Sequence, residues 1–536
     1  MEKRVFVAIL LSIAVMYGYS MLVPQPPHKA SVNQPAASVQ QTTSSSAIQP
    51  VAAGSTVTPT ASAPVPATSA QLQDVVVDTD LFRATFSTLG GMLKSFELKR
   101  YMDVVGKNGK PELLINVDQP AHYTLGQTLP TLGIDQNAVF TPSTTKLDVG
   151  PGEHKVLTFT FATPQGIVLT KQYSFAADSY GIDLDQQVAN TGSVRQEGAL
   201  QLSLISHTAP QVKSSRFATV GPVTLVNDKV EFDKIDKLAK APKSYDTGVL
   251  WSGFGDQYFL SAVMSKKGSI KSVSLQDVNG YLENRFQTNN FILNPGEKID
   301  IPFHLYFGPK ALDQLKAQGD KLDEVINFGW FSAIAKPLLY TLRFFYGYLH
   351  NYGLAIILLT VILKLIFFPL THKSYKSMKQ MQKLQPKMQA LKEKFKDDRD
   401  AMNRAVMELY KTHKVNPLGG CLPMLVQIPV FFALYRALMY SIELRHAPFY
   451  FWIHDLSSKD PYYVTPIIMG ATMFIQQKMT PSNMDPMQAK MMLALPVVFT
   501  FMFLNFPSGL VLYWLVNNIL TIAQQTYINK TLKEVK

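Results

Sequence analysis

Long apolar runs recur along the chain and predict helices that cross a bilayer. The first run, Val5 to Val23, follows the basic start Met-Glu-Lys-Arg, and five more lie from Gly353 onward. A helix of about 20 apolar residues spans a hydrocarbon core of about 30 Å. The predicted spans are residues 1–23, 353–371, 417–440, 462–479, 491–506 and 510–528. We interpret the first as an uncleaved signal anchor, with a cleaved signal peptide as the alternative, because no small-residue cleavage site closes it.

A different pattern, short alternating stretches between turn residues, fills residues 74–325. Phe82, Ala84 and Phe86 alternate with polar residues, and Asn279-Gly280 is a strong hairpin-turn signal. The period of two continues through Ile167, Leu169, Lys171 and Tyr173. It predicts a large, mostly antiparallel β-sandwich domain. This domain has no metal-ligand spacing, nucleophile elbow or phosphate loop, and a groove for sugars or peptides stays open without a residue that identifies it.

Two further segments connect these regions. Residues 24–73 consist mainly of Pro, Ala, Ser, Thr, Gln and Val, and such a composition predicts a disordered tether because it cannot bury enough surface to fold. Residues 330–350 repeat apolar positions at helical spacing beside Lys336, Arg343 and His350. The stripe is too narrow for a span, so it predicts an amphipathic helix in the outer interface. A core helix of the β domain is an equal alternative.

Charge sets the orientation of the predicted spans. Residues 371–416 hold twelve Lys and Arg against five Asp and Glu, whereas residues 441–461 hold only Arg445 and Lys459 against three acids. Because positive loops stay inside, the loop 372–416 is predicted to be cytoplasmic and 441–461 periplasmic. The loop 480–490 and the basic tail 529–536 then lie inside, both termini are cytoplasmic, and the β domain lies outside.

Composition refines this picture. The chain has 536 residues, 47% of them hydrophobic, a net charge of +12 and a mean hydropathy of +0.04, which is too polar for a purely intramembrane protein. A single cysteine, Cys421, excludes an intrachain disulfide framework. The domain outside the membrane must therefore be held together by burial alone.

The basic loop 372–416 is predicted to be a helical hairpin. One apolar stripe is Met378, Met381, Leu384, Met388, Leu391 and Phe395, and a second follows the break at Asp397-Asp398. Lysines such as Lys383 and Lys387 give the hairpin cationic faces that suit anionic lipid headgroups or ribosomal RNA. A solvated face with ordinary positive-inside bias is the alternative, because topology alone requires these charges.

Lys364 is the main candidate functional residue. It stands in the otherwise apolar run 353–370, where a lysine costs about 2.5 to 3.5 kcal/mol on insertion scales, so an intramembrane cation suggests a function. Thr360, Gln427 and Asn517-Asn518 lie at comparable predicted depths, and together they favour a wet interior cavity. The alternatives are a snorkelling lysine and polar residues that only bond helices together.

Two other protein classes fit parts of this pattern. A transporter or channel would explain a lysine in a polar cavity, but the spans show no repeat or paired broken helices. A serine-lysine peptidase would need Ser508 near Lys364, yet Ser508 lies in the outer turn and Lys364 is about 16 Å from Gly353 at helical rise.

Several long motifs carry a specific resemblance. They are FFPLTHKSYKSMKQMQKLQPKMQALKEKF, YKTHKVNPLGGCLPMLVQIPVFFALYRAL, FWIHDLSSKDPYYVTPIIMGATMFIQQKM and FPSGLVLYWLVNNILTIAQQ. In order across Trp330 to about Asn529, they resemble the membrane core of the YidC insertase family of Gram-negative bacteria. The anchor, tether and external β domain are placed as in that family.

The resemblance implies a polytopic α-helical inner-membrane protein of six spans, with a five-helix insertase core and a large periplasmic β-supersandwich. It implies an ATP-independent insertase and folding chaperone, not an enzyme, that needs no cofactor or metal. Its implied partners are nascent membrane proteins, the Sec translocon, the ribosome and signal recognition particle pathway, and anionic lipids, but not DNA. The implied groove residues are Lys364, Thr360, Gln427, Tyr513, Trp514 and Asn517, and the implied recruitment residues are Met378, Met381, Met388, Lys383 and Lys387.

The chain departs from that family at three positions. Typical members carry arginine where this chain has Lys364, so the positive charge is kept but the planar guanidinium fork is lost. Arg436, near the outer end of its span, and Asn505 are more polar than expected, and they leave open how the outer side is sealed.

Overall fold

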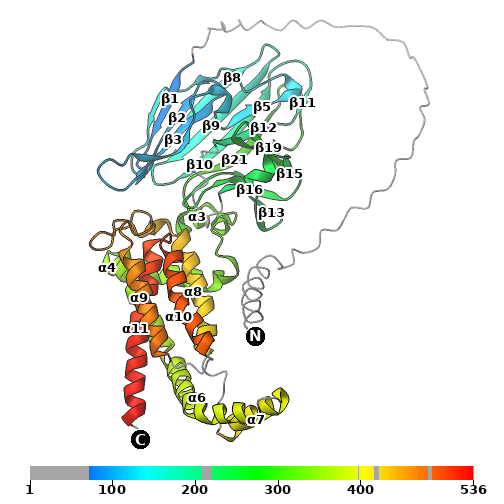
Figure 1. The fold of residues 1–536 in the computed structure, drawn as a ribbon. Coiled ribbons are helices and arrows are strands. Elements are labelled where there is room, and N and C mark those ends of the chain that lie inside the picture. Colours follow the sequence, from blue (N-terminus) through cyan, green and yellow to red (C-terminus); the bar gives the residue numbers. More distant parts are fainter. Residues whose placement is uncertain are drawn as a thin grey trace, which may run out of the picture. The chain divides into compact units, whose positions relative to one another are not determined.

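The structure is a computed structural model and describes residues 72–207, 220–395, 398–413, 415, 422–480 and 486–534. The predicted anchor 1–23 and nearly all of the predicted tether 24–73 lie outside these residues, as do Cys421 and Asp397. Within them the chain forms a β domain followed by a helical region (Figure 1). The prediction of a β-rich domain before a helical C-terminal region is therefore confirmed.

The largest sheet of the β domain has nine strands. In chain order they are β6 (Thr141–Pro142), β8 (His154–Ala162), β9 (Ile167–Ala176), β10 (Gly181–Asn190), β13 (Gly221–Val226), β14 (Lys229–Phe232), β16 (Val249–Gly255), β17 (Phe259–Ser265) and β21 (Lys298–Pro309). Their order in the sheet is β14-β13-β16-β17-β21-β10-β9-β8-β6, and all of these neighbours pair antiparallel. Long hairpins such as β8 to β9 account for much of this order.

Two five-stranded sheets complete the domain. One consists of β1 (Asp74–Asp78), β2 (Phe82–Ser87), β3 (Met92–Met102), β4 (Pro111–Asn116) and β7 (Lys146–Asp148), in the order β4-β3-β2-β1-β7. The other consists of β5 (Gly126–Thr128), β12 (Gln201–His207), β15 (Lys243–Tyr245), β18 (Ile270–Val278) and β19 (Tyr281–Thr288), in the order β15-β18-β19-β12-β5. A separate pair joins β11 (Gln196–Gly198) to β20 (Phe291–Leu293).

Both five-stranded sheets pack on the large sheet, which makes the domain a sandwich. The ring of Phe86 on β2 lies 4.8 Å from that of Tyr173 on β9, as an aromatic pair in a packed core should. On the same face, nearer the β14 edge of the large sheet, Asn284 of β19 donates a 2.8 Å hydrogen bond to Ser252 of β16. The alternating residues Phe82, Ala84 and Phe86 are all buried, because one face of β2 is turned to the core.

Lys171 of β9 is buried in this core. Its alternating position places it on the inward face between Leu169 and Tyr173, and its side chain is fully withdrawn from solvent. The Nζ atom donates to the carbonyl oxygens of Leu125 at 2.7 Å, Gly90 at 3.0 Å and Gly91 at 3.4 Å. Burial lowers the pKa of Lys171 to about 7, because the protein interior disfavours the charged form.

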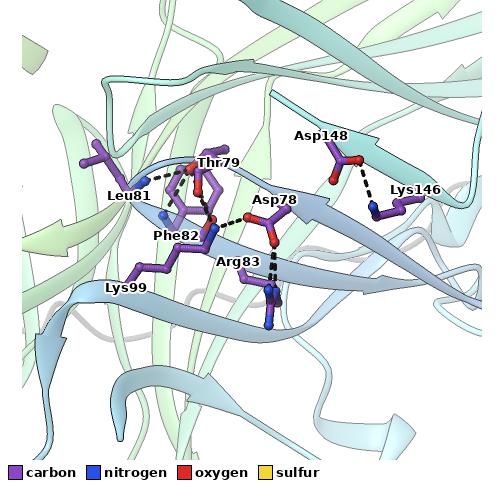
Figure 2. Close-up of polar contacts among 8 residues, drawn as sticks. All are labelled: Asp78, Thr79, Leu81, Phe82, Arg83, Lys99, Lys146 and Asp148. Carbon is purple, nitrogen blue, oxygen red and sulfur yellow. Dashed lines mark hydrogen bonds and ion pairs between the residues drawn. The ribbon is translucent and has the colours of Figure 1, made fainter. Parts of the chain in front are cut away.

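A charged cluster holds the first three strands together at the surface (Figure 2). Asp78 on β1 accepts hydrogen bonds from Arg83 of β2, at 2.8 and 3.1 Å, and from Lys99 of β3. Partial burial by itself would raise the pKa of Asp78, but the hydrogen bonds and charges of Lys99 and Arg83 outweigh it and lower that pKa. Lys146 and Asp148 form a second pair on β7, 2.8 Å apart.

The helical region contains eight helices of more than ten residues among the described residues. They are α4 (Ser332–Leu349), α5 (Tyr352–Ile366), α6 (Phe368–Lys394), α7 (Arg399–Thr412), α8 (Leu422–Tyr440), α9 (Val464–Met479), α10 (Pro486–Phe503) and α11 (Ser508–Glu534). Two shorter helices, α2 (Ile235–Leu238) and α3 (Leu312–Gln318), lie within and after the sheets. Helix α11 packs against α5 and α9, and α4 packs against α5 and α8.

The helix predicted over 353–371 is shorter in the structure. Helix α5 ends at Ile366, and α6 begins at Phe368 with Pro369 in its first turn, so the axis bends by 59°. Pro369 has no N–H group to donate to the Leu365 carbonyl four residues back, and its ring crowds that turn, which accounts for the break at Phe367. Of the helices in the described ranges, none is by itself both long and apolar enough to cross a membrane, and α5 with the first part of α6 meets that test only as a bent pair.

The amphipathic segment 330–350 forms helix α4. Its buried residues are Ala335, Leu338, Leu339 and Leu342, which pack toward α5 and α8. Leu349, at the end of the predicted apolar stripe, is exposed to solvent. The basic loop forms α6 and α7 as an antiparallel pair, with Asp398 capping α7 through hydrogen bonds from Asp400 and Ala401.

Candidate functional site

A pocket lies around Lys364, where α5 and the start of α6 meet α8 and α11. Its lining residues are Thr360, Leu363, Lys364, Phe367, Leu370, Thr371, Gln427, Val430, Tyr513 and Asn517. Five of the six predicted groove residues therefore lie around one space, although they come from helices up to about 150 residues apart in the chain. Their role in binding stays a prediction.

The pocket is narrow in this conformation. Its cavity volume is about 20 Å³. A site needs about 10 to 15 Å³ on that measure to hold one water. The pocket is thus wide enough for water beside Lys364 but too narrow for a polypeptide, unless the helices move apart.

Lys364 is half-buried and has a single hydrogen-bond partner among the described residues. Its Nζ atom donates to the Oγ1 atom of Thr521 on α11 at 2.8 Å. No Asp or Glu carboxylate of the described chain lies within ion-pair distance of it, although fourteen other ion pairs occur there. The pocket therefore presents a cation without a matching anion.

Two other polar contacts shape the pocket. The Nε2 atom of Gln427 on α8 donates to the Oδ1 atom of Asn517 on α11 at 2.9 Å. Thr360 is buried and donates to the Ile356 carbonyl one turn back at 2.6 Å, as helical threonines commonly do. Gln427 and Asn517 thus hold each other, while Thr360 is satisfied by its own helix.

Thr521 is the site residue that the sequence reasoning missed. It follows Asn517 by one helical turn, and it donates to the Asn517 carbonyl at 2.6 Å while it accepts from Lys364. Tyr513, Asn517 and Thr521 recur every four residues, which places them on one face of α11. That spacing in the sequence was the signal that would have found Thr521.

Trp514 points to a different environment from Tyr513. It does not line the pocket, and its ring packs at 4.6 Å against Phe431 of α8 and at 5.2 Å against Phe503 of α10. Consecutive helical residues point about 100° apart, so only Tyr513 lines the pocket, although its ring also lies 6.4 Å from that of Phe431. Trp514 instead belongs to an aromatic cluster that joins α8, α10 and α11.

A second polar face of α11 turns toward α9. Asn518 donates to Thr472 at 3.3 Å, and Gln525 donates to the Met479 carbonyl at 2.6 Å. The buried oxygen of Gln525 and both amide atoms of the nearby Gln524 have no protein partner in the described chain. Buried polar atoms of this kind are commonly satisfied by water.

The predicted recruitment residues lie on α6. Met378, Met381 and Met388 are half-buried, and Met388 accepts a hydrogen bond at 3.2 Å from the hydroxyl of Tyr410 on α7. Lys383 and Lys387 are exposed, and Lys387 contacts His413 at 2.9 Å. Met388 thus contributes to the contact between α6 and α7, and Lys387 meets the end of α7 at His413.

The serine-lysine arrangement is contradicted by the geometry. Ser508 is buried and donates to the Asp455 carbonyl at 2.9 Å, whereas Lys364 bonds to Thr521, thirteen residues further along the same helix. That separation is about 20 Å at helical rise. A proton cannot pass directly between Ser508 and Lys364.

Two family profiles together match nearly all of the described chain. Residues 74–341 match the family described as YidC periplasmic domain, and residues 344–535 match the family described as 60Kd inner membrane protein. A membrane protein insertase YidC of Geotalea daltonii is 56% identical over 537 residues, which cover 99% of this chain and 100% of that protein. One of Geobacter sulfurreducens is 56% identical over 533 residues, with 99% of each chain covered.

A solved structure is also similar. The crystal structure of an active YidC insertase with its first transmembrane domain resolved is 19% identical, covers 84% of this chain and is itself covered to 92%, with a TM-score of 0.36. The sequence relatives, rather than this structure, define the family.

Proposed function

Because the chain belongs to the YidC family of membrane protein insertases, we propose that it inserts hydrophobic segments of nascent proteins into the inner membrane and assists their folding, without ATP. The supporting observation is the pocket in which Lys364 carries a charge without a carboxylate partner. A cation in such a place favours an acidic or polar group that arrives from another chain.

The pocket would act by shortening the apolar path of a polar substrate segment. A short substrate tail with an acidic residue is drawn to Lys364, where the Gln427 and Asn517 amides and any water offer further hydrogen bonds. The adjacent hydrophobic segment then moves sideways into lipid. Burial of its apolar surface supplies about 25 cal/mol per Å², so no nucleotide is needed.

The pocket at Lys364 has room for about one water, so a substrate can enter only if α5 and α11 separate. The 2.8 Å bond between Lys364 and Thr521 is the polar contact that closes this gap. An incoming carboxylate replaces the hydroxyl as the partner of the ammonium and forms the stronger, charge-assisted bond. The substrate itself thereby contributes to opening the pocket.

The proposal includes the topology predicted from charge. Six spans, cytoplasmic termini, an interfacial α4 and a cytoplasmic α6 and α7 hairpin put the mouth of the pocket on the side where nascent chains are made. In a Cys421→Ser background, Gln382→Cys should react with an impermeant maleimide only after the inner membrane is opened, whereas Ser458→Cys should react in spheroplasts. The reverse pattern would contradict the orientation.

The partners follow from the same surfaces. The exposed Lys383 and Lys387 on α6 suit ribosomal RNA or anionic lipid headgroups near the pocket mouth, and the half-buried Met378, Met381 and Met388 suit apolar substrate if the hairpin opens. Cooperation with the Sec translocon and delivery by the signal recognition particle pathway are part of the proposal for larger substrates.

The central test is insertion of a single-span substrate whose short translocated tail carries one Asp, with purified protein in liposomes. Lys364→Ala should lower the insertion rate about tenfold or more, because a lost charge-assisted contact is worth about 1.5 to 3 kcal/mol. Lys364→Arg should insert at nearly the normal rate, since it keeps the charge.

Matched controls separate this role from general damage. Lys459→Ala removes an exposed lysine far along the chain and should insert normally. A substrate with Asn in place of the tail Asp should lose most of its sensitivity to Lys364→Ala. Equal insertion of the Asp substrate by the Ala variant would remove Lys364 from the mechanism.

A further inference from the structure

A second pocket opens on the β domain, on the outer face of the sheet that contains β12 and β19. Its lining residues are Gly126 and Thr128 of β5, Gln201, Leu202 and Ser203 of β12, Glu283 and Arg285 of β19, and the loop residues Asp135, Gln136 and Asn137. These strands lie side by side in the sheet (Figure 1). The pocket is thus built on paired strands and covered by one loop.

This pocket is much wider than the one at Lys364. The centre of a water-sized sphere can occupy about 330 Å³ of it, within about 680 Å³ of empty space. Pockets for small molecules measure about 300 to 1,000 Å³, so a ligand the size of a disaccharide fits without movement of the sheet.

Its lining is polar almost throughout. Three amides, two hydroxyls, two carboxylates and one guanidinium belong to the lining residues, and the apolar side chain of Leu202 is buried in the core on the other face of β12. An apolar ligand would gain little here, because the walls offer hydrogen bonds rather than hydrocarbon. The ligand must therefore be rich in groups that donate and accept hydrogen bonds.

One of the two carboxylates of the pocket is paired with its one guanidinium. Arg285 binds Glu283 through its Nε atom at 3.2 Å and its Nη2 atom at 3.0 Å, and Gln276 donates to the same carboxylate at 2.5 Å. Asp135 accepts from the Asn137 backbone at 2.8 Å and has no ion-pair partner among the described residues. An anionic ligand therefore finds no free cation and meets the negative charge of Asp135, whereas a sugar hydroxyl can donate to that carboxylate.

We propose that this β12 and β19 pocket binds a neutral saccharide. A sugar hydroxyl both donates and accepts, which matches a wall of amides, hydroxyls, carboxylates and one guanidinium. Ser203 is nine-tenths buried at the floor, and its hydroxyl donates to the Gly126 carbonyl at only 3.3 Å, so it can turn to a ligand at little cost. Tyr281 stands two residues before Glu283 on the same strand face and stacks on His122 at 3.6 Å, which adds an aromatic surface next to the pocket.

The test uses the full-length protein in lipid nanodiscs, because sugar-based detergents would occupy the pocket. Saturation-transfer NMR would probe maltose, trehalose and diacetylchitobiose, with glucose 6-phosphate as an anionic comparison and trialanine as a peptide comparison. We expect saturation transfer to at least one neutral disaccharide and little to the other two probes. Thr128→Trp, which fills the pocket from a half-buried position, should abolish the signal.

Milder variants keep the test independent of folding. Gln201→Ala and the exposed Asn137→Ala should weaken binding about threefold to tenfold, as the loss of one neutral hydrogen bond predicts. Gln172→Ala, an exposed glutamine on β9, is the matched control and should bind normally. No transfer to any disaccharide, or transfer unchanged in Thr128→Trp, would overturn the site, and transfer to trialanine alone would overturn the ligand class. Neither result depends on insertion activity.

Discussion

Lys171 in the β domain is fully buried, whereas Lys364 in the helical region is half-buried, and the groups around the two side chains differ. Three backbone carbonyls accept from the Lys171 Nζ atom in a packed core, whereas one hydroxyl contacts Lys364 at the edge of a pocket. The first lysine uses its donors to satisfy its own fold. The second keeps donors available, which is what a site for another molecule requires.

The two lysines also differ in the hydrogen-bond partners that would remain if each lysine were replaced. Without Lys171, the Gly90 and Leu125 carbonyls lose a buried donor. Without Lys364, Thr521 still bonds to the Asn517 carbonyl. Removal should therefore damage stability in the β domain and function in the helical region.

The largest expected effect is that of Lys171→Met on the β domain. It should lower the free energy of local unfolding by about 2 to 4 kcal/mol, because buried carbonyls are left without partners. Hydrogen exchange of peptides from β9 in the full-length protein measures this. Lys229→Met, at an exposed position of β14, is the control, and an equally small effect of both variants would show that Lys171 is not structural.

Replacement by arginine should affect stability differently at positions 171 and 364. Lys171→Arg forces a larger, planar group into a filled core and should cost about 1 to 3 kcal/mol in the same exchange measurement. Lys364→Arg enters a pocket with free space and should leave the stability of α5 unchanged. Destabilisation at position 364 but not at 171 would reverse the comparison.

The pH dependence of the β domain should carry the signature of Lys171. Its pKa of about 7 in the folded state lies below the ordinary value of 10.5, so the unfolded chain binds more protons between these two pH values. Stability should therefore rise with pH there, by up to about 2 kcal/mol from pH 7.5 to 9. Exchange data corrected for the intrinsic rate should show this rise in the native chain, and Lys171→Met should lack it.

The smallest effect concerns the partner of Lys364. Thr521→Val removes the hydroxyl at nearly constant volume and should speed insertion about threefold to tenfold, because the hydrogen bond that closes the gap between α5 and α11 no longer has to break. Thr521→Ser keeps the hydroxyl and should insert at the normal rate. If Val instead slows insertion, the contact orients Lys364 for the substrate rather than closing the pocket.

Much of this comparison could be predicted from local pattern. The alternation at Phe82, Ala84 and Phe86 predicts a buried strand face, and the helical spacing of Thr360 and Lys364 predicts a shared face of α5. The partners of the two lysines could not be predicted in this way. Lys171 meets Leu125, and Lys364 meets Thr521, across separations of 46 and 157 residues that only the tertiary fold closes.

Two other features could not be predicted from the hydrophobic pattern of the sequence. The apolar run that ends at Leu370 predicts one continuous helix, but Pro369 divides it, and hydrophobicity carries no record of a bend. The width of a pocket is likewise set by side-chain packing between helices. The sequence therefore predicted five residues that line the Lys364 pocket, but neither their spacing nor the narrowness of the gap.

Helix α11 touches a different neighbour with each of three faces. Thr521 meets α5, Asn517 meets Gln427 of α8, and Asn518 and Gln525 meet α9. One extra residue in this helix turns everything after it by about 100°. An insertion of a single residue would therefore misalign the contacts of α11 with several neighbouring helices at once, although it would hardly change the length or the hydrophobicity of the helix.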